Sequence, residues 1–294
     1  MKANTHRPED IIPPVSRDLL LDELTADKFL RETNNARNQI FIFDAHDSPM
    51  LMREVARLRE LSFRMAGGGT GLSLDEDDFD SMPSPYKQLI VWDPEEKQIV
   101  GGYRYILCPE APLDETGKPR LATSELFNFS QTFLHQYLPY TIELGRSFVQ
   151  PDYQPSRDNR KGIFSLDNLW DGLGALVVDH RDMKYFFGKV TMYTHFNVLA
   201  RDLILHYLYE FFPDHEKLVT PLQPLVLKTP QEELMASFEP EKGAEHNFRI
   251  LQQLVRNQGE NIPPLVSSYA NLSPSMRTFG TAINEHFGGV EETA

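Results

Sequence analysis

Two spacings of apolar residues alternate along the chain, one typical of strands and the other of helices. Patterns typical of strands occupy residues 40–43, 89–92, 99–107, 141–149 and 185–192. Apolar residues at helical spacing occupy residues 17–34, 49–64, 123–136, 166–178, 198–212 and 244–257. The glycine-rich stretch at 66–71 ends the second of these helices. This order predicts an α/β fold with a mixed central sheet flanked by helices.

The pattern also divides the chain into three parts. Residues 1–37 are an N-terminal extension, residues 38–212 carry the alternating core, and residues 213–294 are richer in proline and polar residues. We expect the last part to be a helical and irregular extension that packs on the core. The chain ends at Glu291-Glu292-Thr293-Ala294, where the pattern predicts a strand that continues.

Composition excludes several classes of protein. Cys108 is the only cysteine, which rules out an internal disulfide and a cysteine-rich metal site and fits a reducing, cytoplasmic compartment. The polar start from Met1 to Asp10 is unlike a signal segment, and the apolar runs are too short to cross a bilayer. A net charge of −14 argues against nucleic acid as a partner, and it limits any peripheral contact with a membrane to a local basic patch.

Charged side chains recur inside or beside segments that build a core. On the predicted 49–64 helix, Arg59 and Phe63 lie one turn apart and share a face. An acidic run follows, in which Asp77 and Asp80 lie three residues apart. Taken singly, these features are an ordinary surface arginine and a solvated loop. The acidic run also lacks the glycine and the spacing of a calcium-binding loop, so we expect no metal there.

Two predicted strands carry further charges. Arg104 lies inside the apolar strand 99–107, and Glu143 and Arg146 lie three residues apart in a later strand. A regular strand would send the latter two side chains to opposite faces, whereas a bulge at Gly145 would bring them nearer to one face. Either the strand is irregular there or the two residues have separate roles. Because buried charge is costly unless it is paired or used, the set predicts a polar active site across the sheet.

A basic loop precedes the predicted 166–178 helix. Arg157, Arg160 and Lys161 place three cations within five residues. A strand, a basic loop and a helix N-terminus together favour a phosphate cradle. The loop matches neither a P-loop nor a dinucleotide fingerprint, and its alternative interpretation is a solvated surface loop.

The ordered set of motifs resembles two related families. Four of the motifs resemble the pattern of acyl-homoserine-lactone synthases, which have an acetyltransferase-like (GNAT) fold: Arg59-x-x-x-Phe63, Asp75-x-Asp77-x-Phe79-Asp80, Gly101-Gly102-Tyr103-Arg104 and Glu143-Leu144-Gly145-Arg146. Four others are more similar to the ornithine lipid and glycine lipid N-acyltransferases, often called hemolysin-like: Arg57-Leu58-Arg59-Glu60, Gly67-Gly68-Gly69-Thr70-Gly71, Leu169-Trp170-Asp171-Gly172-Leu173 and Ile262-Pro263-Pro264-Leu265-Val266-Ser267-Ser268-Tyr269. The resemblance runs from about Arg17 to the C-terminus.

The resemblance implies an N-acyltransferase with no tightly bound cofactor. Family enzymes take an acyl chain from the phosphopantetheine arm of acyl carrier protein and place it on the amine of an amino acid. The implied co-substrate is therefore an acyl carrier protein thioester, or acyl-CoA, and the implied product is an N-(3-hydroxyacyl) derivative of glycine or ornithine, a lyso-aminolipid. The GNAT pyrophosphate motif, Gln/Arg-x-x-Gly-x-Gly/Ala, is absent between the predicted strand 141–149 and the predicted helix 166–178, which favours the carrier protein, whose arm has a single phosphate.

The resemblance also implies a set of active-site residues. The positions that match those of the family are Arg59, Phe63, Asp77, Asp80, Arg104, Glu143 and Arg146. We expect Glu143, directly or through a water, to take a proton from the amine. Backbone N–H groups at an irregular strand would hold the thioester oxyanion.

The remaining polar and apolar groups have expected binding roles. Arg104 and Arg146 would order the carboxylates or bind the carboxylate of the substrate. The basic loop would bind the donor phosphate, and an apolar slot lined partly by Phe63, Phe79 and Phe148 would take the acyl chain. Two alternatives stay open at this point, an acetyl-CoA-dependent acetyltransferase of a small amine and a non-enzymatic binding module in which the charges form a structural network.

Overall fold

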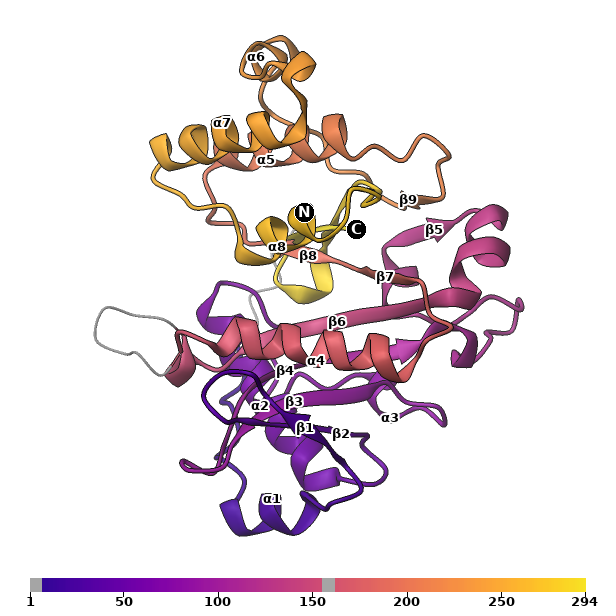
Figure 1. Ribbon diagram of the computed structural model, residues 1–294, viewed down its shortest axis with the longest axis vertical. Coiled ribbons are helices and arrows are strands. Elements are labelled where there is room, and N and C mark those ends of the chain that lie inside the picture. Colours follow the sequence, from indigo (N-terminus) through magenta and orange to yellow (C-terminus); the bar gives the residue numbers. More distant parts are fainter. Residues whose placement is uncertain (1–6, 155–161) are drawn as a thin grey trace. The chain divides into compact units, whose positions relative to one another are not determined.

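The computed structural model describes residues 7–154 and 162–294, and the chain divides into two compact units (Figure 1). The first unit comprises residues 1–122 and 136–188, and the second comprises residues 123–135 and 189–294. The three-part division proposed from the sequence, with boundaries at 37 and 212, stays a prediction. No helix in the two described stretches has both the length and the apolar composition that a membrane span requires.

The first unit is built on a six-stranded sheet. In spatial order its strands are β1 (Phe29–Glu32), β2 (Gln39–Phe43), β3 (Lys87–Asp93), β4 (Gln98–Leu107), β6 (Thr141–Val149) and β7 (Tyr185–Gly188). Neighbouring strands are antiparallel except β6 and β7, which are parallel. The helices of this unit are α1 (Arg17–Glu23), α2 (Pro49–Met65), the short α3 (Asp78–Ser81) and α4 (Ser165–Asp179).

The two faces of this sheet differ in chemistry. One face is apolar, and α4 packs across it against β3 and β4 (Figure 1). Its core contains Leu89, Tyr103 and Tyr105 from the strands and Leu169, Leu173 and Leu176 from α4. Strand residues one position away point to the opposite face. That second face carries Gln88, Arg104 and Glu143, which are buried although they are polar or charged, so the alternation along three strands separates an apolar core from a polar site.

A close approach of two strands and a left-handed backbone explain two glycines of the sequence motifs. A Cβ at Gly101 would overlap the carbonyl oxygen of Phe148 on the neighbouring strand, so only glycine fits there. In the glycine-rich loop after α2, Gly69 has φ +91°, a left-handed conformation that favours glycine. The buried Glu60 carboxylate accepts hydrogen bonds from the backbone N–H groups of Thr70 and Gly71, both at 2.9 Å, and thereby anchors this loop to α2.

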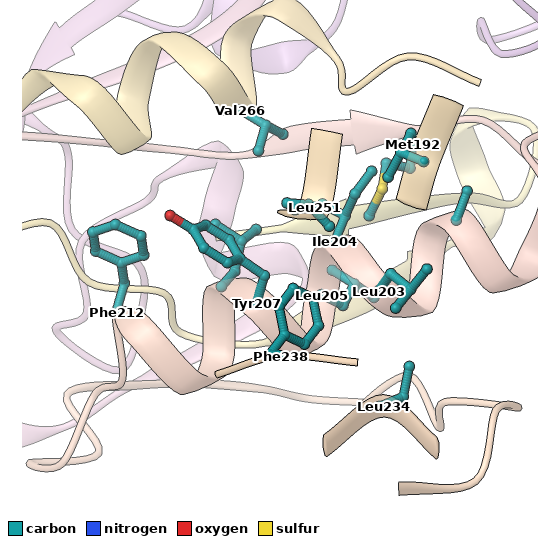
Figure 2. Packing of buried hydrophobic residues seen from close by; sticks show 13 residues of the cluster. Met192, Leu203, Ile204, Leu205, Tyr207, Phe212, Leu234, Phe238, Leu251 and Val266 are labelled. Atoms are coloured by element: carbon teal, nitrogen blue, oxygen red, sulfur yellow. The ribbon is translucent and has the colours of Figure 1, made fainter. Parts of the chain in front are cut away.

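The second unit has its own hydrophobic core. Its helices are α5 (Val198–Phe211), α6 (Gln231–Ala236), α7 (Gly243–Asn257) and α8 (Pro264–Leu272). Strands β8 (Val190–Met192), β10 (Thr281–Asn284) and β11 (Val290–Thr293) form an antiparallel sheet, and β5 (Phe127–Phe129) pairs with β9 (Val219–Pro221). Figure 2 shows Ile204 and Tyr207 of α5 gathered with Leu251 of α7, with Val266 of α8, and with Phe238, which follows α6.

Three predicted elements differ from the structure. The helix predicted at 17–34 ends at Glu23 and is followed by β1, whose residues are mostly exposed. The helix predicted at 123–136 is instead a 3-10 turn, the strand β5 and a π-helical turn (Phe133–Tyr137). The strand predicted at 185–192 is interrupted at Lys189, where the chain passes from the sheet of the first unit to that of the second.

Candidate active site

A network of buried charges lies on the polar face of the first sheet. Arg59 comes from α2, the aspartates from the segment around α3, Arg104 from β4, and Glu143 and Arg146 from β6. These charged residues come from several elements of one unit, and a continuous chain of hydrogen bonds, ion pairs and ring contacts joins them.

Asp80 is the shared acceptor of this network. Its Oδ2 accepts hydrogen bonds from Nη1 of Arg59 and from Nη1 of Arg104, each at 3.0 Å. Its Oδ1 accepts one from Nε2 of Gln88 at 3.0 Å, and Arg59 donates in turn to the Gln88 side-chain oxygen. The side chains of Arg59, Asp80 and Arg104 are at most 2% exposed. Such buried ions are tolerated because each is paired and hydrogen-bonded.

Asp77 forms the second centre of charge. Arg104 donates to its two carboxylate oxygens with separate terminal nitrogens, at 2.6 and 2.9 Å. The same carboxylate caps α3, since it accepts from the backbone N–H of Phe79 at 3.1 Å, and the Asp80 side chain completes the capping box. Burial raises the pKa of Asp77, but the charge and hydrogen bonds of Arg104 outweigh it and hold this pKa well below its usual range.

Asp75 pairs with Arg146, and sequence reasoning did not include it among the site residues. Nε of Arg146 lies 2.9 Å from Oδ2 of Asp75, and Nη2 lies 3.4 Å from Oδ2 of Asp77. Burial raises the pKa of Asp75 despite the attraction of Arg146. The signal for Asp75 was its place two residues before Asp77 in the acidic run.

A bulge in β6 brings Glu143 and Arg146 into the same network. The pairing of β4 with β6 shifts by one residue between Arg104–Gly145 and Gly102–Phe148. Arg146 itself has φ 52°, a left-handed conformation that is uncommon for a residue other than glycine. Of the two alternatives left open by the sequence, the strand is therefore irregular. The strained backbone lies at Arg146 rather than at Gly145.

Glu143 is connected to the network by a tyrosine, Tyr86, which sequence reasoning missed. Oε2 of Glu143 accepts a hydrogen bond from the hydroxyl of Tyr86 at 2.9 Å, and the Arg104 guanidinium lies 5.0 Å from the centroid of the Tyr86 ring. Tyr86 and Gln88 directly precede the apolar run 89–92. Extending the strand period of two backwards from Ile90 through these positions would have placed both on the polar face.

The three phenylalanines expected to line an acyl slot are all buried. Phe63, Phe79 and Phe148 are at most 9% exposed. Phe79 packs edge-on against Tyr86 with centroids 5.7 Å apart, and the Arg104 guanidinium lies 5.6 Å from its ring centroid. Phe79 therefore supports the charged network, and a role of the three rings in acyl binding stays a prediction.

The predicted phosphate-binding residues are a separate case. Arg157, Arg160 and Lys161 lie outside the described residues, so their role stays a prediction from the sequence.

Solvent reaches the network unevenly. The side chains of Asp77 and Arg146 are 30% and 16% exposed, whereas that of Arg104 is 2% exposed. Asp77 and Arg146 are thus the members best placed to meet a small polar ligand. The buried arginines fix the carboxylates around them.

Comparison with known proteins shows which enzymes the chain is similar to. A glycine N(alpha)-acyltransferase from Bacteroides thetaiotaomicron is 56% identical over 285 residues, which cover 97% of this chain and 84% of that protein. Another, from Phocaeicola vulgatus, is 54% identical over 285 residues, which cover 97% of this chain and 87% of that protein. The profile of the acetyltransferase (GNAT) domain matches residues 58–160, which confirms the predicted fold class. No solved structure matches the chain significantly.

Proposed function

The chain belongs to the family of GNAT-type N-acyltransferases that includes the two glycine N(alpha)-acyltransferases, and we propose that it transfers a fatty acyl chain from a thioester to the amine of glycine. The similarity to those two enzymes along nearly the whole chain carries this proposal. GNAT acyltransferases use acyl-CoA as co-substrate. We propose acyl carrier protein as the donor here, because the sequence between β6 and α4 lacks the GNAT pyrophosphate motif.

The reaction needs a free amine. The glycine amine, with a pKa of about 8 or above, is mostly protonated at neutral pH. In the proposed mechanism, Glu143 takes the surplus proton, directly or through a water, while the amine nitrogen attacks the thioester carbonyl carbon. The carbon–nitrogen bond forms, the carbon–sulfur bond breaks, and the thiolate leaves and takes up a proton. Glu143 is buried on the polar face, where a carboxylate is shielded from bulk water.

Two other features of β6 have proposed roles. Backbone N–H groups at the bulge around Arg146 would stabilise the oxyanion of the tetrahedral intermediate, since donors aimed at developing charge act strongly in a dry site. The Arg146 guanidinium would bind the glycine carboxylate, because it is more exposed than that of Arg104. With a 3-hydroxyacyl donor, the product would be a lyso-aminolipid.

Purified enzyme tests donor and acceptor together. A long-chain 3-hydroxyacyl carrier protein, the matching acyl-CoA and acetyl-CoA are each offered with glycine, ornithine or alanine, and the products are measured by mass spectrometry. We expect N-acylglycine to dominate and the carrier protein thioester to give the highest kcat/KM. A preference for acetyl-CoA would replace this proposal with an acetyltransferase of a small amine. A preference for ornithine would reject glycine as the acceptor.

A further inference from the structure

A buried tyrosine holds the carboxylate proposed as the base. Tyr86 is 0% exposed, and its hydroxyl donates a hydrogen bond to Oε2 of Glu143 at 2.9 Å. The residues lie 57 positions apart, so the contact depends on the pairing of β3, β4 and β6. The hydrogen bond reduces the cost of burying both groups, because a buried carboxylate without a donor would carry its full desolvation penalty.

Three contacts fix the orientation of the Tyr86 hydroxyl. The hydroxyl oxygen accepts a hydrogen bond from the backbone N–H of Ala122 at 3.0 Å. A phenol has a single hydrogen to donate, and that hydrogen is directed to Glu143. The ring is held by the Arg104 guanidinium, 5.0 Å from its centroid, and by the edge-on ring of Phe79. The side chain that meets Glu143 is therefore fixed at both its ring and its oxygen.

We propose that Tyr86 is a positioning residue of the acyl transfer reaction: its hydrogen bond orients the Glu143 carboxylate and keeps it ionised, ready to accept a proton. This inference rests on the proposed role of Glu143 as base. A hydrogen bond donated to a carboxylate favours the charged form, so the Tyr86 hydroxyl extends the pH range in which Glu143 can act. Tyr86 itself stays neutral, because burial and the Glu143 charge raise its pKa well above the ordinary value.

The surroundings of Glu143 define what else acts on it. Burial and the Glu143 carboxylate raise the pKa of the Cys108 thiol, which directly follows β4, so this thiol adds no charge. The Arg104 guanidinium, from β4, lies over the Tyr86 ring that meets this carboxylate. On the α2 side, Arg59 is engaged by Asp80 and Gln88. Removal of the Tyr86 hydroxyl leaves these charges in place, which isolates the contribution of the hydrogen bond.

The primary test is the pH dependence of kcat/KM for Tyr86→Phe, which keeps the ring and removes the hydroxyl. Hydrogen bonds to charged groups correspond to roughly a 10- to 100-fold effect, so the acid limb should move to higher pH by about 1 unit or more. The matched control is Tyr105→Phe, which removes the hydroxyl of a buried tyrosine on the apolar face of the same sheet. The control should leave the acid limb where it is in the parent enzyme.

A double-mutant cycle separates positioning from structural support. If Tyr86 acts through Glu143, then Tyr86→Phe should lower kcat in the parent enzyme but have little effect in the Glu143→Gln background. Equal effects of Tyr86→Phe in both backgrounds, or an unmoved acid limb, would overturn the inference. Near-normal turnover of Glu143→Gln would instead reject the base role itself, so failure of the proposed mechanism and failure of the Tyr86 inference give different results.

Replacement of Tyr86 by 3-fluorotyrosine provides a second variant of nearly the same shape. Its phenol is more acidic and donates a stronger hydrogen bond, so the acid limb should move to lower pH, opposite to the shift in Tyr86→Phe. This comparison keeps the inference testable if Tyr86→Phe folds poorly. A shift in the same direction for both variants would contradict the positioning role.

Discussion

Arg104 binds both oxygens of Asp77, at 2.6 and 2.9 Å, across 27 positions of the chain. One of the same guanidinium nitrogens also reaches Asp80 at 3.0 Å. Because a planar guanidinium matches a carboxylate in this two-point geometry, the contact fixes α3 against β4 as well as balancing charge. The Arg104–Asp77 pair therefore both stabilises the first unit and sets the positions of the charged groups in its polar site.

We predict that Arg104→Met destabilises the protein by about 3–5 kcal/mol, because it leaves the buried Asp80 carboxylate and the half-buried Asp77 carboxylate without this partner. The free energy of unfolding in urea measures the loss. Arg249→Met is the matched control, since Arg249 pairs with Glu245 on an exposed helix face, and its effect should stay within about 1 kcal/mol. Equal losses in the two variants would show that the Arg104 network adds no more stability than a surface ion pair.

Asp77 should make the stability of the folded protein depend on pH in the acid range. Its pKa is depressed in the folded protein, so its contribution to stability is fully present above the unfolded value of about 3.9 and is lost as the pH falls further. Asp75, whose pKa is raised, acts in the opposite sense. The urea midpoint between pH 3 and 6 should therefore vary less in Asp77→Asn than in the parent protein. Asp78→Asn, the control from the same acidic run, should keep the parent slope.

The fold could be predicted where local pattern and tertiary packing agree. The strands around Leu89, Arg104 and Leu144 follow their apolar pattern, and the structure confirms them. Segment 123–136 has helical spacing, but β5 within it pairs with β9 more than 80 positions later in the chain, and Phe129 faces Val219 there. Such long-range pairing overrides a local preference and leaves no periodic signal in the segment itself.

Some residues of the candidate site could likewise be predicted from the sequence, and others could not. The charges at Arg59, Arg104 and Glu143 stood out because charge inside apolar elements is costly. Their arrangement into one network could be anticipated from that cost. The partners Asp75 and Tyr86 were missed, because an acidic residue in an acidic run and a tyrosine before a strand are ordinary until the fold brings them to their partners.

The packing of α4 on the sheet predicts that alanine substitution has opposite effects on stability at two glycines of this helix. A Cβ at Gly172 would lie 2.7 Å from Cδ2 of Leu89, whereas one at Gly174 would meet nothing within 4 Å. Gly172→Ala should therefore destabilise by about 1–3 kcal/mol through overpacking. Gly174→Ala should stabilise by about 0.5–1 kcal/mol, because alanine is the better helix former. Thermal unfolding of both variants checks this, and a loss of similar size in both would contradict the close contact.

The left-handed conformation at Arg146 predicts an unusual order of stabilities in a strand. Arg146→Gly and Arg146→Ala both lose the ion pair with Asp75, but only alanine retains the steric cost of φ 52°. The glycine variant should be more stable by about 1 kcal/mol. At Ser147, whose φ is not positive, glycine should be the less stable of the same two substitutions. The same order at both positions would argue against the bulge.

The central claim is that this polar site acylates glycine, and labelled lipids test it most directly. Cells that express the chain are fed ¹³C-glycine, and their lipids are compared by mass spectrometry with those of cells expressing Glu143→Gln. We predict labelled N-acylglycine with long 3-hydroxyacyl chains, reduced roughly 10²–10⁴-fold in the variant at equal levels of folded protein. Unlabelled N-acylornithine in place of labelled N-acylglycine would contradict the account. So would an amount of product in cells expressing Glu143→Gln that equals the amount in cells expressing the parent chain.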